Sequence, residues 1–381
     1  MKNVVIAGYA RSPFTLANRG ALAKVRPDEL VGQVVKGLVE KTKVNTADIE
    51  DLIMGCAFPE AEQGLNVARM VGFIAGLPIS VAGTTVNRFC GSSMQSIHMA
   101  AGAIQMGAGE AFICAGIESM SRVPMTGFNP APHPKLYKDY PNAYVSMGVT
   151  AENLAKQYKI DRATQQEVAI ESHAKAAKAQ EQGKFKDEIV PIVQGNLRVE
   201  ADGCIRPGTT QETLNGLEPA FDAKGSVTAG TSSPLTDGAA AVLVCSEAYA
   251  DKHGLTKLAR IKSIAVSGCA PEIMGIGPVG ATKKALDRAG LKIEQMDVVE
   301  LNEAFAAQVL ACTREWGFSP GDFARMNVHG SGISLGHPVG ATGGRILTTL
   351  AREMQRREAR FGLETMCIGG GQGMTAIFER A

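Results

Sequence analysis

The feature that most constrains the fold of this chain is an internal duplication. Residues 31–54 read as an amphipathic helix followed by a short apolar strand, VGQVVKGLVEKTKVNTADIEDLIM. A similar sequence recurs near the C-terminus as VGATKKALDRAGLKIEQMDVVEL. Ile49 aligns with Met296 at an offset of about 247 residues. Cys114 in AFICAGIES aligns with Cys367 in TMCIGGGQG at an offset of about 253. Two ordered correspondences indicate that one unit of helices and strands is used twice.

Strand-like and helical runs alternate in both copies, which predicts an α/β fold in which sheets are flanked by helices. The expected strands are Val4–Ile6, Leu52–Met54, Ala111–Cys114, Val298–Leu301 and Thr365–Ile368. Two such layers placed back to back would bury one helix of each copy. The candidates are Ser92–Met106, which is apolar or small nearly all round, and Thr342–Met354.

A long segment between the two copies has no counterpart in the second one. We therefore expect a first repeat at 1–118 completed by about 244–258, an inserted loop domain at 119–243, and a second repeat at 259–381. Inside the insert we predict a polar helix from Arg162 to Gln182, with Asp161 as its N-cap and Gly183 as its stop. The insert is either a surface excursion or a module that holds a ligand, since long insertions are often functional.

Composition narrows the class of protein. The 381 residues are 45% apolar, enough for a large core, and 39 basic residues against 38 acidic ones leave no field that favours nucleic acid. The eight cysteines contain no C-x-x-C pair, which indicates reduced thiols. No run of about 18 apolar residues is present, and the apolar start is too short for a signal peptide. We expect a soluble, cytoplasmic protein without membrane insertion.

Cys90 lies in TTVNRFCGSSMQS, where a β-prone run meets a glycine-serine turn and then a helix of small residues. A thiol at a helix N-terminus is stabilised as thiolate by free N–H groups and by the helix dipole, so we expect a lowered pKa and a reactive nucleophile. Taken alone, a single cysteine among apolar residues is better explained as buried packing.

His337 stands between Gly336 and Pro338 in a glycine-rich segment, which predicts a constrained loop. An imidazole suits a general base at neutral pH. Shifting Cys90 by the repeat offset of about 247 residues lands on His337, so thiol and imidazole are expected in equivalent loops of the two copies. A purely structural histidine remains the alternative.

Two further segments carry candidate groups. Cys367 opens CIGGGQG, whose glycines allow the backbone to approach a ligand and to aim N–H groups at an oxyanion. No helix follows it, which argues against a dinucleotide site and leaves a tight turn between strands as the alternative. Asn302 begins NEAFAAQ after a strand and would either cap the next helix or hold a water or an oxyanion.

A zinc site formed by Cys90, His329, His337 and Cys367 is conceivable from residue types alone. No pair of these residues has the short spacing of a structural zinc site. We therefore expect no metal and no bound cofactor.

Together these segments resemble the thiolase family over essentially the whole chain, and most closely the bacterial 3-ketoacyl-CoA thiolases of fatty-acid β-oxidation. VNRFCGSSMQ, VTAGTSSPLTDGAAAVLV, NEAFAAQ, GHPVGATG and CIGGGQG appear in family order. The resemblance implies a thiolase-like duplicated α/β unit in five layers, αβαβα, with an inserted loop domain that carries much of the coenzyme A contact.

The resemblance also assigns roles to residues. Cys90 would be the acylated nucleophile, His337 its base and an oxyanion donor, and Cys367 the acid/base for the α-carbon proton. Asn302 would hold a water that completes the oxyanion hole of His337, and the N–H groups of Cys90 and Gly369 would form the second hole. The family positions that bind substrate are Ala229 and Ser233, which contact pantetheine, and Phe305, which lines the acyl pocket.

The implied reaction is cleavage of a 3-ketoacyl thioester by coenzyme A, an acyl transfer for which a cysteine nucleophile is suited. An acetyl-CoA C-acetyltransferase that forms acetoacetyl-CoA is the alternative, although Ser146 stands where such enzymes typically carry a histidine. A non-catalytic thiolase-like carrier would be expected to lack Cys90, His337 or Cys367. A condensing enzyme of fatty-acid synthesis usually pairs its cysteine with two histidines or with His and Asn, so Cys367 argues against it.

The resemblance also implies partners. Its members are homodimers or homotetramers, and the proline-rich loop Arg122–Asn142 resembles a docking arm. Many degradative bacterial members work with a multifunctional hydratase/dehydrogenase subunit, which is a candidate partner. One departure concerns the text before the histidine motif, often N-x-x-G-G-A in the family. This chain reads NVHGSGIS, with Ser331 at the second glycine and His329 as an added titratable group, and we expect tuning rather than loss of activity.

Overall fold

The computed structural model describes residues 2–381. In the first unit the strand order is β1-β8-β5-β3-β4. These strands are β1 (Val4–Arg11), β3 (Ile49–Gly55), β4 (Ala82–Val86), β5 (Ala111–Ser119) and β8 (Thr236–Ser246). β8 runs antiparallel to β1 and β5, whereas β3 is parallel to β5 and β4. The short strand β2 (Thr15–Leu16) pairs with β8.

The second unit repeats this arrangement. Its strands are β9 (Ala259–Gly268), β10 (Val298–Leu301), β11 (Phe361–Ile368) and β12 (Gln372–Arg380). Their order is β9-β12-β11-β10, with β12 antiparallel to both neighbours and β10 parallel to β11. Order and direction therefore match β1-β8-β5-β3, which confirms the duplicated unit. The two units meet where β1 and β9 pair through Val5 with Arg260 and Ile6 with Ala259.

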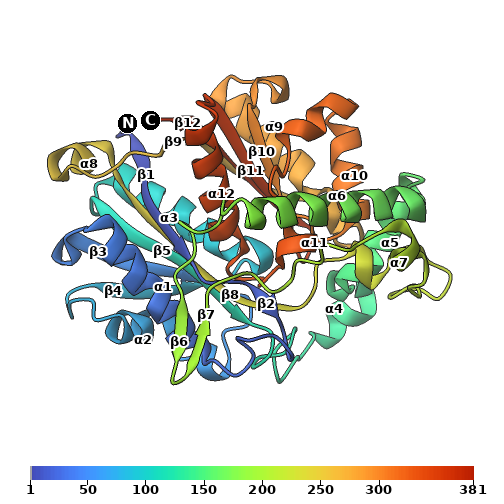
Figure 1. Cartoon of the computed structure of the whole chain (residues 1–381), viewed down its shortest axis with the longest axis horizontal. Coiled ribbons are helices and arrows are strands. Elements are labelled where there is room, and N and C mark those ends of the chain that lie inside the picture. Colours follow the sequence, from blue (N-terminus) through green and yellow to red (C-terminus); the bar gives the residue numbers. More distant parts are fainter. Residues whose placement is uncertain (1) are drawn as a thin grey trace.

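Helices complete five layers, as the sequence predicted. The helices are α1 (Pro27–Thr42), α2 (Val67–Ile74), α3 (Ser92–Met106), α9 (Gly277–Ala289), α10 (Ala306–Glu315) and α12 (Thr342–Arg356). α1 and α2 cover the outer face of the first sheet, and α9 and α10 cover the outer face of the second. α3 and α12 pack on each other between the sheets. Figure 1 shows the first unit in blue and cyan beside the second in orange and red, with α12 at their boundary.

The strands bury both faces because their apolar residues alternate between two cores. In β3, Leu52 and Met54 join the outer core under α1, whereas Ile53 faces the middle helices. In β8, Leu243 faces outward and Val244 faces inward. Alternate residues of a strand point to opposite faces, so nearly continuous apolar runs are what a sheet covered on both sides requires.

The two middle helices were predicted from sequence, and the structure confirms both. α3 has the predicted bounds, and α12 continues two residues beyond Met354. Glycines allow the close approach: a Cβ on Gly343 would lie 2.8 Å from the Cβ of Met94, and one on Gly344 would lie 3.0 Å from the Cβ of Ala240. Both distances are too short for ordinary packing, so α12 needs glycine at its first turn.

The inserted segment leaves the first sheet after β5 and returns to it in β8. It contains α4 (Pro134–Asp139), α5 (Met147–Gln157), α6 (Arg162–Glu181), β6 (Ile192–Gln194), β7 (Leu197–Val199) and α7 (Gln211–Asn215). The predicted polar helix is α6, whose N-cap Asp161 accepts the N–H of Thr164 at 2.8 Å and which is followed by Gly183 at a φ of 67°. α6 crosses the front of the molecule in Figure 1.

β8 begins at Thr236, inside the range 119–243 that the sequence assigned to the insert. The reason is that the strand starts with TDGAAA, whose small and polar residues give no apolar signal. Asp237 is nevertheless buried, because its carboxylate accepts hydrogen bonds from Ser119 and Ser121. The remaining helices are α8 (Glu247–His253) and α11 (Gly332–Leu335).

Candidate active site

Cys90 lies in a single turn, Phe89–Gly91, that leads directly into α3. Phe89 has a φ of 40°, a strained left-handed conformation for a bulky residue, which marks the turn as a specialised one. Burial raises the pKa of the thiol to about 11, although the N–H groups of Gly369 and of Cys90 itself act to lower it. The expected lowering by the helix N-terminus is therefore wrong for the resting site: desolvation outweighs the N–H groups.

Cys367 lies at the end of β11, fully buried, and Gly369–Gly371 turn the chain into β12. Burial, and then the neighbouring Cys90, raise the pKa of the Cys367 thiol well above its usual value. A Cβ on Gly91 would lie 2.6 Å from the Cδ1 of Ile368, so the turn of Cys90 packs directly on this strand end. The structure thus brings Cys90, Cys367 and Gly369 together.

The tight turn that the sequence offered as an alternative for CIGGGQG is also present. Gly370 and Gly371 have φ values of 78° and 82°. A Cβ on Gly371 would lie 2.3 Å from the carbonyl oxygen of Cys269, which excludes any side chain there. The tight turn and the N–H group of Gly369 therefore belong to the same glycine-rich segment, and the two interpretations of CIGGGQG do not exclude each other.

His337 lies in the loop before α12, the place that corresponds to Cys90 before α3. Gly336 has a φ of 97°, and the N–H of His337 donates to Thr236 Oγ1 at 3.0 Å. Burial, with a smaller contribution from the Arg345 charge, lowers the pKa of the imidazole to about 3. The ring is therefore neutral in the resting protein.

The hydrogen bonds of His337 define its tautomer. Nδ1 is 2.6 Å from Thr342 Oγ1, and that hydroxyl donates to the carbonyl oxygen of Pro338 at 2.9 Å. A hydroxyl has one proton, so Nδ1 must be the donor in the first contact. Nε2 is then the unprotonated nitrogen, which is the arrangement of a general base.

Asn302 follows β10 and is buried, with its Nδ2 3.4 Å from Nε2 of His337. Its backbone N–H donates to Thr365 O at 3.0 Å, which fixes it beside β11. The alternative that Asn302 caps the next helix is wrong, because α10 begins at Ala306 with Phe305 as its N-cap. The Oδ1 atom of Asn302 accepts no hydrogen bond from the described residues.

The predicted substrate-binding residues lie in two settings. Phe305 joins the apolar cluster that contains Cys367, and its ring meets Phe221 edge-on at a centroid distance of 5.9 Å. Ser233 is next to Phe305, since its N–H donates to Ala304 O at 2.9 Å. Ala229 is exposed at the start of a short turn in the same segment.

Sequence reasoning missed two residues. Thr342, described above, orients His337. Glu118, at the end of β5, accepts the N–H groups of Ala57 at 2.8 Å and Gly340 at 2.9 Å and thereby fastens the loop that follows His337. Burial raises the pKa of Glu118 to about 7. An acidic residue that ends the apolar strand AFICAGIES was the available signal for Glu118.

His329 lies apart from the other three residues of the zinc site that residue types alone made conceivable. Its Nε2 is 2.8 Å from Glu353 Oε1, and its ring is edge-on to Phe185. Within residues 2–381 no three His, Cys, Asp or Glu side chains are grouped so that they could hold a metal ion. No helix in the same range combines the length and the apolar character that crossing a bilayer requires.

Comparison with known proteins is consistent with this geometry. The N-terminal thiolase domain model matches residues 4–248, and the C-terminal thiolase domain model matches residues 255–380. The 3-ketoacyl-CoA thiolase of Bacillus subtilis (strain 168) is 46% identical over 392 residues, with each chain covered at 100%. The 3-ketoacyl-CoA thiolase of Vibrio cholerae serotype O1 (strain ATCC 39315 / El Tor Inaba N16961) is 49% identical over 387 residues, again with 100% of both chains covered. This chain belongs to the thiolase family.

Proposed function

We propose that this protein is a 3-ketoacyl-CoA thiolase, which cleaves a 3-ketoacyl-CoA with coenzyme A to acetyl-CoA and a shortened acyl-CoA. The observation that carries the proposal is that two buried thiols, Cys90 and Cys367, are neighbours, and that a neutral His337 lies in the loop leading into α12, which packs on α3 and on the turn of Cys90. The printed names of the full-length relatives support the same activity.

In the first half of the reaction Cys90 transfers its proton to Nε2 of His337 as its sulfur attacks the ketone carbon of the substrate. The N–H groups of Cys90 and Gly369 stabilise the resulting oxyanion. Collapse breaks the bond between the α-carbon and the former ketone carbon and leaves an acyl thioester on Cys90. The departing enolate receives a proton on carbon from Cys367, and acetyl-CoA leaves.

In the second half coenzyme A enters and gives its thiol proton to the Cys367 thiolate. Its sulfur attacks the acyl-Cys90 carbonyl, and the shortened acyl-CoA is released. Cys90 regains its proton from His337, so both thiols return to their starting state. During the first half, Nε2 of His337 bears the proton taken from Cys90 and, together with a water held by Asn302, stabilises the enolate oxygen.

The pKa values decide how this proton moves. A thiol with a pKa near 11 beside an imidazole with a pKa near 3 favours the neutral pair. Deprotonation of Cys90 therefore accompanies attack on the substrate, when the negative charge passes to an oxygen that is already faced by N–H donors. Such a site protects its nucleophile until a substrate is bound.

Coenzyme A is a substrate here, and we propose no resident cofactor or metal. We place the reaction in the cytoplasm. The function is tested by steady-state cleavage of short-, medium- and long-chain 3-ketoacyl-CoA. The reaction is monitored through the loss of absorbance of the substrate's enolate. Cleavage of acetoacetyl-CoA alone would favour the acetyltransferase, and absence of cleavage with every chain length would contradict the proposal.

We also propose that the protein is a homodimer or homotetramer. Three exposed apolar side chains in the segment between β3 and the edge strand β4 support this: Leu65 is 87% exposed, Ile79 is 82% exposed and Phe73 is 49% exposed. β4 pairs only with β3 among the described strands, so its other edge offers backbone groups to a second copy. A multifunctional β-oxidation subunit remains a proposed further partner.

A further inference from the structure

Two glutamates lie side by side in the interior, on neighbouring strands of the second sheet. Glu300 of β10 and Glu364 of β11 are register partners, and both are 0% exposed. Their strand neighbours Leu301 and Leu363 belong to the outer core, so the two carboxyl groups point to the opposite face, toward α12. None of the four carboxyl oxygens has a hydrogen-bond partner within residues 2–381.

One guanidinium faces this pair. Arg345 of α12 is 1% exposed, and its Nη1 lies 3.8 Å from Glu300 Oε2. Its Nη2 donates to Ser331 Oγ at 3.0 Å, whereas its Nε and Nη1 donate to no described residue. Ser331 is the residue that departs from the glycine-rich family text, and this hydrogen bond gives its hydroxyl a structural role.

The two carboxyl groups cannot both be ionised beside one guanidinium, so at least one of them holds a proton. Around Glu364 the charged neighbours are Arg345 and Glu300. The other ionisable groups near Glu300 and Arg345 are Glu303, Glu353, Glu188 and Arg11. Burial raises the pKa of Glu300 to about 8 and that of Glu364 well above its usual value. Two carboxylates cannot share one buried cation at low cost, so Glu364 is a neutral acid at neutral pH.

This cluster lies on the same strands and the same helix that lead to the proposed catalytic residues. Asn302 is two residues after Glu300, and Cys367 is three residues after Glu364. Arg345 is one helical turn after Thr342, the residue that orients His337, and its charge lowers the pKa of His337. Arg345 therefore touches the loop of Ser331 and faces the two strands whose ends carry catalytic groups.

We propose that Arg345 is a positioning residue of the thiolase site, and that a neutral Glu364 keeps its guanidinium on Ser331. An ionised Glu364 would compete with Ser331 for the guanidinium, so loss of that one proton would loosen the loop before His337 from β10 and β11. The proposal rests on the proposed function for the roles of Asn302, His337 and Cys367. The protonation of Glu364 does not depend on it.

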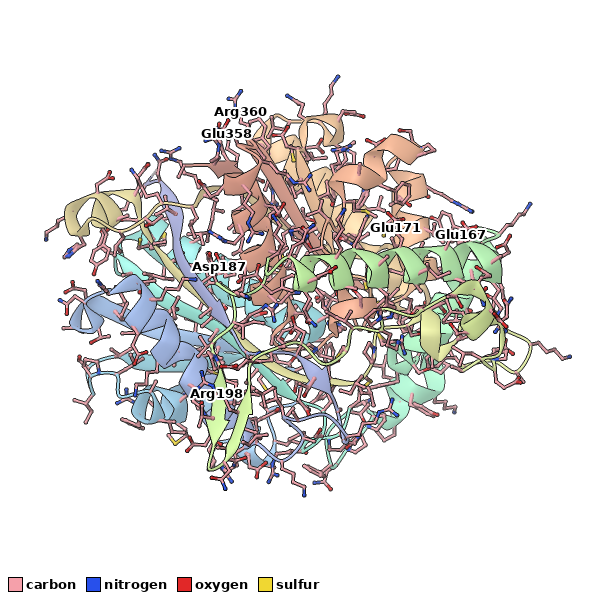
Figure 2. The ribbon with its side chains drawn as sticks, viewed as in Figure 1. Glu167, Glu171, Asp187, Arg198, Glu358 and Arg360 are labelled. Atoms are coloured by element: carbon pink, nitrogen blue, oxygen red, sulfur yellow. The ribbon has the colours of Figure 1, made fainter. Side chains whose placement is uncertain are left out.

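Thermal denaturation of wild type and Glu364→Gln between about pH 6 and pH 9 tests the trapped proton. A group whose folded pKa is raised above its unfolded value of 4.5 contributes stability that declines as pH rises toward the folded pKa. The melting temperature of Glu364→Gln minus that of wild type should therefore become more positive as pH increases. Glu167→Gln is the control, because Glu167 lies on the exposed face of α6 (Figure 2). Wild type and Glu364→Gln melting in parallel would overturn the proposal.

Kinetics test the positioning. Ser331→Ala should lower kcat for cleavage by roughly tenfold, the effect of losing a charge-assisted hydrogen bond, with little change in KM. Arg345→Met should raise the pKa of His337 and move the acid limb of the pH–rate profile for Cys90 acylation to higher pH. Arg345→Lys retains the positive charge and should leave the position of that acid limb unchanged. If Arg345→Met does not fold, Ser331→Ala and Arg345→Lys carry the test. Unchanged kcat in Ser331→Ala would overturn the proposal, whereas a wild type without thiolytic activity would refute the proposed function alone.

Discussion

Nδ1 of His337 lies 2.6 Å from Oγ1 of Thr342, and the same hydroxyl donates to the carbonyl oxygen of Pro338. This pair of contacts decides which imidazole nitrogen is unprotonated, and in the proposed mechanism that nitrogen accepts the proton of Cys90. Because Thr342 is also the first residue of α12, the tautomer of the base is tied to the start of a buried helix. A catalytic preference is thus built into the middle layer of the fold.

The first prediction concerns this hydroxyl. Thr342→Val preserves the shape of the side chain but leaves Nδ1–H of His337 without its acceptor, so the imidazole should lose its fixed tautomer. We expect acylation of Cys90 and cleavage of 3-ketoacyl-CoA both to slow by roughly tenfold or more. Rapid-quench acylation and steady-state cleavage are the measurements. Thr342→Ser, which retains the hydroxyl, is the control, and an unaffected Thr342→Val would refute the role.

The second prediction separates acylation from carbon chemistry. Cys367→Ala should still be acylated on Cys90 by a simple acyl-CoA, because thioester exchange moves no α-carbon proton. It should lose cleavage by roughly 10²–10⁴-fold, the range for a missing general acid or base. Cys90→Ala should lose both steps, and His337→Ala should impair both. Normal cleavage by Cys367→Ala would contradict the two-thiol mechanism and leave CIGGGQG as a turn alone.

Much of the fold could be predicted because the internal repeat indicates that two units share one order of strands and helices. Once residues 31–54 and the second copy were aligned, the offset that took Cys90 to His337 put both residues before equivalent buried helices. The structure confirms that relation in the placement of α3 and α12. The alternation of strand-like and helical runs then predicted sheets flanked by helices.

What the sequence did not predict depends on contacts between distant segments. Glu300 and Glu364 look like unrelated strand residues until the register of β10 and β11 makes them neighbours. The pKa of Cys90 is a balance between burial and N–H donors, and only the packed structure reveals that burial prevails. The start of β8 was missed because alanine and glycine give no strand signal by themselves.

The third prediction follows from that raised pKa. With the Cys90 thiol at a pKa of about 11, iodoacetamide in the absence of substrate should alkylate it slowly at neutral pH, with a rate that keeps rising through about pH 10. Alkylation at each cysteine is read by peptide mass analysis, with the half-buried Cys269 as the reference thiol. A rate that levels off near neutral pH would indicate a resting thiolate and contradict the neutral pair.

The fourth prediction identifies the acyl carrier. Brief incubation with an acyl-CoA, followed by acid quenching and peptide mass analysis, should place the acyl group on Cys90. The physical reason is that the N–H groups of Cys90 and Gly369 face this sulfur and would stabilise the tetrahedral adduct formed there. An adduct on Cys367 instead would reverse the assignment of nucleophile and acid.

The last prediction concerns self-association. Ile79 is 82% exposed beside the edge strand β4, so Ile79→Asp should leave the fold intact and place a charge in an apolar contact between copies. Light scattering of wild type should give a mass of two or four 40.0-kDa chains at micromolar concentration, and Ile79→Asp should shift it toward one chain. Val193→Asp, on the hairpin of β6 and β7 in the inserted segment, is the control because Val193 is also exposed. A wild-type mass near one chain would contradict the oligomer, whereas an oligomer unaffected by Ile79→Asp would move the contact to the loop Arg122–Asn142, whose shortening should then dissociate it.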